Sequence, residues 1–170
     1  MSGGLDVSMV IQQLVNGLAL GSVYALIALG YTMVYGIIRL INFAHGDIFM
    51  LGAYYGYFAI TMFNIPFALA LPLTMILAAM TGMAVERLAY KPLRQAPRIA
   101  SLITAIGVSL LLQNLGLKFF EARPRPYPRI MSTVVWDVGG VVVSNVQLIM
   151  LALAVGLMVL ISLIVYRTKI

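Results

Sequence analysis

The sequence predicts an all-α protein, a polytopic bundle of transmembrane helices with about five spans. Its 170 residues are 62% hydrophobic and only 9% charged, whereas a soluble domain needs about a quarter of its residues charged to cover a surface that faces water. The hydrophobic residues also form runs close to the roughly 20 helical residues that cross a ~30 Å hydrocarbon core. Short basic segments separate these runs, a pattern typical of loops beside lipid headgroups.

Five apolar segments are the expected spans. Met9–Ile38 is longer than one straight span and contains four glycines, so we expect it to tilt or to break into a full helix and a short second piece. Ile48–Phe63 is shorter than a comfortable span. In Pro66–Val85 the proline stands in the first turn, where its missing N–H costs little. The last two segments are Ser101–Leu117 and Asn145–Val165.

Two longer connections join these spans, Glu86–Arg98 and Lys118–Ser144. Both are expected to be loops. Within the second, two β-branched runs flank Gly139-Gly140, which predicts a small hairpin near residues 134–143.

The basic residues indicate the orientation, because cytoplasmic loops carry an excess of Lys and Arg. The side of the Glu86–Arg98 loop and the C-terminus has seven, with Arg39 counted there, and the side of the Lys118–Ser144 loop has four. We therefore expect the first side to be cytoplasmic, and the hairpin to be extracytoplasmic.

Small residues recur at helical spacing inside the spans. Gly17, Gly21 and Ala25 form one stripe, and Gly52 and Gly56 begin another. Ser101, Ala105, Ser109 and Gln113 form a third and more polar stripe. In lipid, such stripes favour close helix packing, although a stripe that lines a transport pathway is the alternative.

One polar segment, Asn42 to Asp47, interrupts the long apolar region at the N-terminal end, and it contains the only histidine, His45. Polar backbone at membrane depth is tolerated where it is buried in protein or lines a wet cavity, and ionisable groups there are usually functional. One interpretation is a broken or re-entrant helix near residues 39–48 that presents its end and side-chain dipoles to a substrate pathway, with Asn42, Phe43, His45, Gly46 and Asp47 as the candidate pathway residues. The alternative is an ordinary cytoplasmic turn in which Asn42 caps the next helix and Asp47 favours its first turn.

Enzymatic function is not expected. One histidine and no cysteine do not supply the usual zinc ligands, and the chain has neither a phosphate-binding loop nor a dinucleotide fingerprint. We expect no cofactor, no metal and no nucleic-acid partner, and we expect contact with membrane lipid.

Several blocks of the sequence together resemble one family, the LivH-type permease subunit of bacterial ABC importers for branched-chain amino acids. The blocks are Asn16–Leu26, Gly30–Gly36, Ile41–Asp47, Met50–Tyr54, Glu86–Arg94 and Ile103–Ser109, and the ending Tyr166–Ile170 also fits. The most specific are Asn-Phe-Ala-His-Gly and Glu-Arg-X-Ala-Tyr-X-Pro. The Lys118–Ser144 loop resembles the family least.

The resemblance implies a multi-pass protein of the bacterial cytoplasmic (inner) membrane. Its partners would be a second, homologous permease, two cytoplasmic ATPase subunits and a periplasmic amino-acid-binding protein. Because members of the family are longer, residues 1–170 are expected to be the N-terminal part of a single transmembrane domain, ending before the cytoplasmic coupling loop. On this basis the cytoplasmic side is expected to be anchored by three basic residues, Arg87, Lys91 and Arg94, rather than these contacting the ATPase. The run Arg123–Arg129 is either a contact for the binding protein or a solvated loop.

Two other functions stay open at this stage. The chain could be a secondary transporter or a channel in which the His45/Asp47 turn is an ion or proton site. It could also be a non-transporting membrane scaffold.

Overall fold

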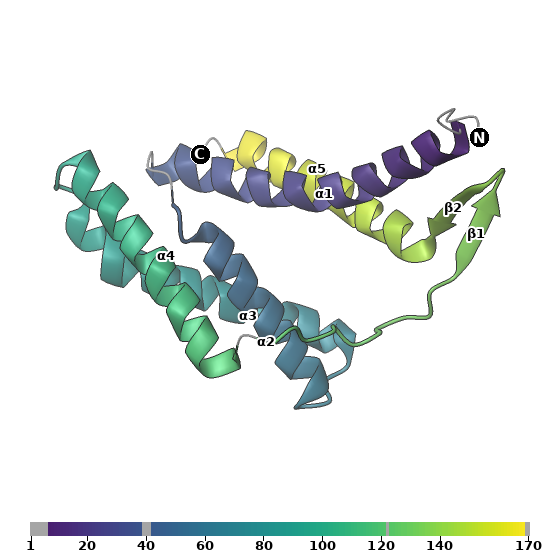
Figure 1. The fold of residues 1–170 in the computed structure, drawn as a ribbon. Coiled ribbons are helices and arrows are strands. Elements are labelled where there is room, and N and C mark those ends of the chain that lie inside the picture. The colour runs from purple at the N-terminus through teal and green to yellow at the C-terminus, as the bar shows by residue number, and fades with distance from the viewer. Residues whose placement is uncertain (1–6, 39–41, 122, 169–170) are drawn as a thin grey trace, which may run out of the picture. The chain divides into compact units, whose positions relative to one another are not determined.

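The computed structural model describes residues 7–38, 42–121 and 123–168. It divides into two compact units, one formed by residues 33–130 and the other by the chain up to Thr32 together with residues 131–170. The described residues contain five α-helices and one β-hairpin (Figure 1). The predicted polytopic helical bundle is thereby confirmed, and each unit is described by itself below.

The long N-terminal apolar segment forms one uninterrupted helix, α1 (Val7–Ile38). The glycines inside it do not break it, so the predicted short second piece does not occur within these bounds. Helix α5 (Asn145–Thr168) lies beside the first part of α1, and Gln147 Nε2 donates a hydrogen bond to Asn16 Oδ1 at 3.0 Å. Around Gly17 and Gly21 an added Cβ would meet nothing within 4 Å, so the packing role predicted for them and for Ala25 stays a prediction.

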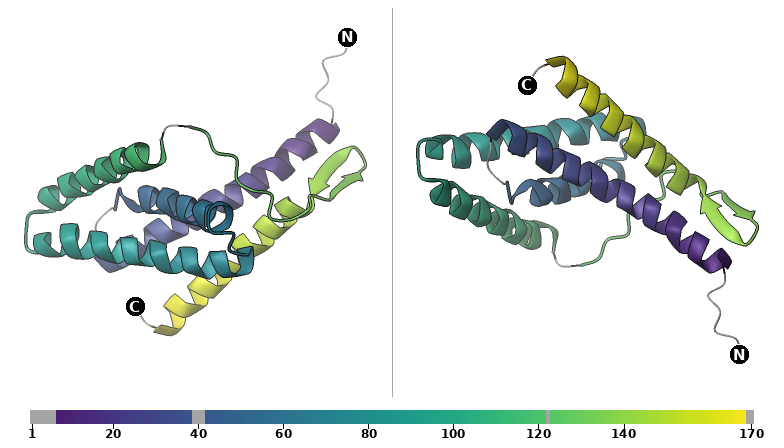
Figure 2. Two further views of the ribbon diagram at one scale, coloured as in Figure 1. Left: turned by 90° about the horizontal axis from the view of Figure 1, so that it is seen from below. Right: turned by 90° about the horizontal axis from the view of Figure 1, so that it is seen from above.

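In the other unit, α2 (His45–Thr61) lies between α3 (Phe67–Val85) and α4 (Arg98–Phe120), as both views in Figure 2 show. The small residues of α2 face α3. A Cβ added to Gly52 would lie 3.8 Å from Ala78 Cβ, and one added to Gly56 would lie 3.4 Å from Thr74 Oγ1. This close approach is the geometry that small residues permit between helices in lipid.

The connection Glu86–Arg98 is not the loop that the sequence predicts. Helix α3 continues without a break into a π-helical turn, η1 (Glu86–Tyr90), and a 3₁₀ turn, η2 (Lys91–Leu93). Only a short stretch remains before α4. The prediction was wrong because charge and proline marked this segment as a loop, while proline is accepted in the first turn of a helical segment, as Pro92 is here.

A two-stranded antiparallel hairpin precedes α5, formed by β1 (Val135–Val138) and β2 (Val141–Ser144). Gly139 and Gly140 form its turn with φ values of +65° and +84°. Two-residue hairpin turns of this kind need positive φ at both positions, which glycine adopts without strain. The predicted hairpin is confirmed.

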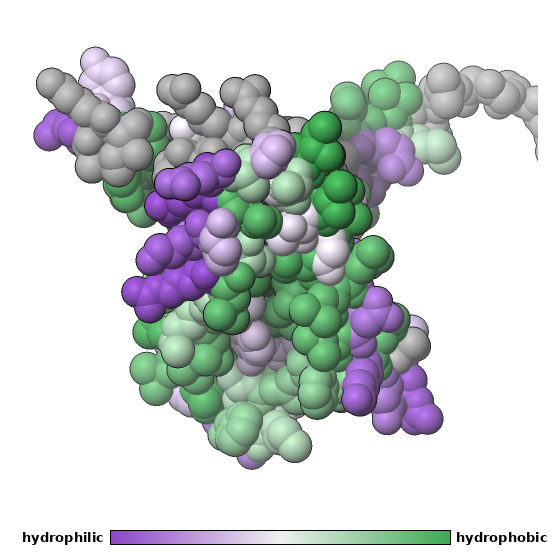
Figure 3. All heavy atoms as spheres, turned by 90° about the vertical axis from the view of Figure 1, so that its left-hand side faces the viewer, coloured by the Kyte–Doolittle hydropathy of each residue, from purple (hydrophilic) through white to green (hydrophobic). Residues whose placement is uncertain are grey.

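Four helical segments in the described part of the chain are long and apolar enough to cross a bilayer: Val7–Gly36, Phe67–Leu93, Ile99–Phe120 and Asn145–Arg167. The remaining helix, α2, has 17 residues and is short for a full span. Large hydrophobic side chains are exposed along all of these helices. On the face shown in the space-filling view, hydrophilic residues gather in a few groups and hydrophobic residues cover most of the other coloured area (Figure 3). Such a surface suits lipid or partner helices rather than water.

Candidate functional site

The polar segment singled out from the sequence forms the tight turn that leads into α2. Asn42 Oδ1 accepts a hydrogen bond from the Ala44 backbone N–H at 3.1 Å, and the Asn42 carbonyl accepts one from the His45 N–H at 3.1 Å. Asparagine forms local turns of this kind with the backbone two residues ahead. Ala44 is the N-cap of α2 and is completely buried. The described part of the turn is therefore ordered by its own sequence.

Asp47 is the buried acid of this turn, with 7% of its surface exposed. Its carboxylate does not cap α2. Ser109 Oγ donates a hydrogen bond to Asp47 Oδ2 at 2.5 Å, and Gln113 Nε2 donates one to Asp47 Oδ1 at 3.0 Å. Both donors belong to α4, and Gln113 also donates to Ser109 Oγ at 3.1 Å. Hydrogen bonds to a charged acceptor are about twice as strong as neutral ones, so this cluster holds the start of α2 against α4.

The position of this cluster along α4 shows where the turn lies relative to the two ends of that helix. Ser109 stands eleven residues from each end of α4, or about 16 Å at the usual helical rise. Helices α2 and α4 run in the same direction from there, because a Cβ added to Gly116 would lie 3.2 Å from Met50 Cε and the Tyr54 ring stacks on Phe120 at 4.2 Å between centroids. Helix α2 therefore begins beside the middle of α4, and its positive N-terminal dipole is directed there.

The turn is also tied to η1. Tyr90 Oη donates a hydrogen bond to Asn42 Oδ1 at 2.6 Å. Glu86, the first residue of η1, forms an ion pair with Arg94, whose Nη2 lies 2.7 Å from Glu86 Oε1. Asn42 thus joins its own turn to η1, while Asp47 joins the same turn to α4. Three blocks that are distant in the sequence meet at residues 42–47.

The other predicted site residues lie within the same turn. Phe43 is exposed to 42%, and His45 and Gly46 are half-buried in the first turn of α2. Residues 39–41, where the predicted break in the helix begins, lie outside the described residues. The dipoles at the start of α2 and the exposed Phe43 ring together offer polar and apolar contacts within one turn. Among the described residues, no group of three or more potential metal ligands occurs.

The opposite end of α2 carries an aromatic cluster that holds the loop after α4. Tyr54 and Phe58 of α2 contact Phe120, and Arg125 lies over the Phe58 ring at 5.6 Å. Tyr127 reaches α2 as well, and a Cβ added to Gly56 would lie 2.7 Å from its Oη. Burial raises the pKa of the Tyr127 phenol above its usual value, which keeps it protonated. Arg125 and Tyr127 thus contact α2, although both side chains remain exposed.

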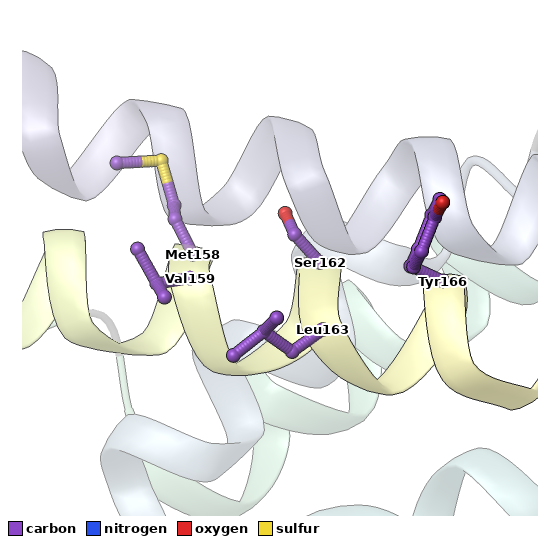
Figure 4. Close-up of a pocket in the computed structure, with 5 residues that line it drawn as sticks. All are labelled: Met158, Val159, Ser162, Leu163 and Tyr166. Carbon is purple, nitrogen blue, oxygen red and sulfur yellow. The ribbon is translucent and has the colours of Figure 1, made fainter.

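A shallow hollow of about 410 Å³ lies along α5 and is almost entirely apolar. Its lining comes from that helix alone, namely Met158, Val159, Ser162, Leu163 and Tyr166. Met158, Ser162 and Tyr166 follow one another at successive turns on one side of the helix (Figure 4). A binding site usually has several polar groups that converge from different elements. The Asn42–Asp47 turn has that property, and the α5 hollow does not.

Comparison with known proteins identifies the family. Residues 13–170 match the family described as branched-chain amino acid transport system / permease component. The chain belongs to this family. It is a multi-pass protein of the inner membrane, as its apolar helices and its relatives show. The predicted resemblance to LivH-type permeases is confirmed.

Two named groups of permeases are among the relatives. The high-affinity branched-chain amino acid transport system permease protein BraD of Pseudomonas aeruginosa is 39% identical over 94% of this chain and 56% of its own length. The corresponding LivH proteins of Salmonella typhimurium and Escherichia coli K12 are 47% and 46% identical, each over 61% of this chain and 36% of their own length. The chain thus spans about half the length of BraD. No solved structure matches it.

Sequence reasoning missed the partners of the turn. It placed Ser109 and Gln113 on a polar stripe of α4 but did not connect them with Asp47, and it interpreted Tyr90 only as part of a motif. A polar stripe at four-residue spacing in an apolar span was the available signal, because such side chains need hydrogen-bond partners in lipid.

Proposed function

We propose that this chain forms part of the translocation pathway of an ATP-driven importer for branched-chain amino acids. In this proposal it pairs with a second, homologous permease. Two separate ATPase subunits hydrolyse the ATP, so the chain itself is not an enzyme, and a periplasmic binding protein delivers the amino acid. The family membership and the permeases named above support this function.

One observation carries the location of the pathway. The Asn42–Asp47 turn begins α2 beside the middle of α4, and it holds a buried carboxylate there. A short helix that starts at mid-span presents its N-terminal dipole inside the membrane, as discontinuous helices do in many transporters. The charge of the Asp47 carboxylate in this first turn favours the ammonium end of an amino acid, and the exposed Phe43 ring offers an apolar contact for an aliphatic side chain.

Leucine uptake by cells that depend on this permease tests the proposal. His45→Ala and Asp47→Asn should reduce the uptake rate while the amount of permease in the membrane stays constant. Glu121→Gln is the matched control, because Glu121 is an exposed acid at the end of α4, and it should transport normally. Normal uptake by both turn variants would contradict a pathway at this turn.

The energy source separates the proposed importer from a secondary transporter. Uptake through the importer should stop when arsenate depletes ATP and should persist when a protonophore collapses the proton gradient. The reverse result would make the His45/Asp47 turn a candidate ion or proton site and would contradict the ATP-driven importer.

A further inference from the structure

The hairpin before α5 has one face without polar side chains. Residues directly opposite each other in an antiparallel pair point to the same side of the sheet. Trp136 pairs with Val143 and Val138 with Val141, so these four form one face. The opposite face carries Asp137 and Ser144 among its four residues. The hairpin is therefore amphipathic.

The two strands of the apolar face differ in how much of them is covered. On β2, Val141 is buried at 8% exposure, and Val143 is half-buried. On β1, Trp136 is exposed to 46% and Val138 to 68%. The outer backbone edge of β2 is occupied by α1, because Gln12 bonds both the N–H and the carbonyl of Val142, at 2.6 and 2.9 Å. Strand β1 is thus the open side of the hairpin.

The hairpin is fixed rigidly at the start of a membrane span. Ser144 ends β2 and Asn145 begins α5 with no residue between them. The Asn145 N–H donates to the Val134 carbonyl at 3.0 Å, and Asn145 Nδ2 donates to the Ser132 carbonyl at 2.9 Å. Since Asn145–Arg167 is long and apolar enough to cross the bilayer, this junction lies at one membrane surface.

We propose that the apolar strip formed by Trp136 and Val138 rests in the interface of the lipid leaflet at which α5 begins. Tryptophan is enriched at this depth because its ring is apolar and its indole N–H is polar. In this placement Asp137, on the other face, points away from the acyl chains, and its carboxylate keeps its hydrogen bond with the Gly140 N–H at 2.8 Å. Lipid is favoured over a protein partner because the adjoining span already fixes the strip at the bilayer surface. This placement of the hairpin is the same whichever solute is transported.

The chain itself contains the probe for this proposal, because Trp136 is its only tryptophan. The chain is reconstituted into phosphatidylcholine vesicles, and tryptophan emission is measured with lipids brominated near the glycerol or deep in the acyl chain. Acrylamide serves as the water-soluble quencher. We expect strong quenching by the shallow bromines, less by the deep ones, and little by acrylamide.

A matched variant tests whether the effect belongs to one face. In Trp136→Phe/Val135→Trp the indole moves by one residue to the opposite face, where Val135 is exposed to 53%. Its emission should lose the quenching by bromolipid and gain quenching by acrylamide. In the unmodified chain, strong acrylamide quenching without bromolipid quenching would overturn the proposal in favour of a water-facing hairpin. Quenching by neither would overturn it in favour of burial against a second copy of the chain, and equal bromolipid quenching of both faces would refute the oriented strip.

Discussion

The cluster that joins Asp47 to α4 allows a quantitative prediction. Ser109→Ala removes the 2.5 Å hydrogen bond to the carboxylate and leaves the 3.0 Å bond from Gln113 in place. A hydrogen bond to a charged group contributes about 1.5–3 kcal/mol in water-soluble proteins, and interhelical bonds in membranes contribute closer to 0.6–1.7 kcal/mol. We therefore expect Ser109→Ala to lower the free energy of unfolding by about 1–3 kcal/mol.

Ser109→Ala should lower the free energy of unfolding by less when residue 47 carries no charge. In an Asp47→Asn background the Ser109 hydroxyl faces an uncharged amide, and neutral hydrogen bonds contribute about 0.5–1.5 kcal/mol. The two substitutions should therefore be coupled by roughly 1 kcal/mol, whereas independent sites add within about 0.3–0.5 kcal/mol. The free energies are measured by titration with sodium dodecyl sulfate in mixed micelles, with helicity followed by circular dichroism.

Ser162→Ala is the control for this cycle, because Ser162 lies on α5 at the shallow apolar hollow. It should change stability little in either background. Equal losses for Ser109→Ala with aspartate and with asparagine at position 47 would refute a charge-assisted bond between α2 and α4.

Three further predictions concern the surroundings of the turn. Tyr90→Phe removes the 2.6 Å hydrogen bond to Asn42. It should lower the free energy of unfolding by about 0.5–1.5 kcal/mol in the same titration and slow leucine uptake. Unchanged stability and unchanged uptake would show that this bond supports neither the turn nor transport. Gly56→Ala places a Cβ 2.7 Å from Tyr127 Oη. The gain of about 1 kcal/mol in helix propensity offsets part of an overpacking cost of about 1–3 kcal/mol, so we expect a net loss of about 0–2 kcal/mol, and Tyr127→Phe should reduce it by removing that oxygen. For the orientation, single cysteines at Arg94→Cys and Arg129→Cys in this cysteine-free chain should react differently with an impermeant maleimide on intact cells; label at 129 alone is expected, and label at 94 alone would invert the topology.

Local patterns predicted most of the secondary structure. Apolar runs located the helices within a few residues, because burial in lipid requires continuous apolar sequence. Gly139-Gly140 between β-branched runs located the hairpin, because only positive φ closes so tight a turn. The π-helical turn at Glu86–Tyr90 was not predictable, since the charged residues that resemble a loop are held by the ion pair between Glu86 and Arg94 and by the bond from Tyr90 to the turn.

The candidate site was located from the sequence but could not be assembled from it. The break in the apolar run at residues 42–47 identified the turn. Its partners are 62 residues away at Ser109 and 48 away at Tyr90. Helical spacing shows which residues of α4 share a face, but it does not show which helix that face contacts or where along the helix axis the contact lies. That position decides whether the turn lies at the membrane surface or beside a pathway.

The central claim is that the start of α2 borders the path of the amino acid. Because the chain lacks cysteine, Phe43→Cys creates a single thiol at the exposed position of the turn. Its labelling rate by a small water-soluble maleimide is measured in vesicles during ATP-driven transport, with and without leucine. We expect the thiol to be labelled and leucine to slow the labelling. A thiol that never reacts, or one whose labelling leucine leaves unchanged while transport proceeds, would contradict it.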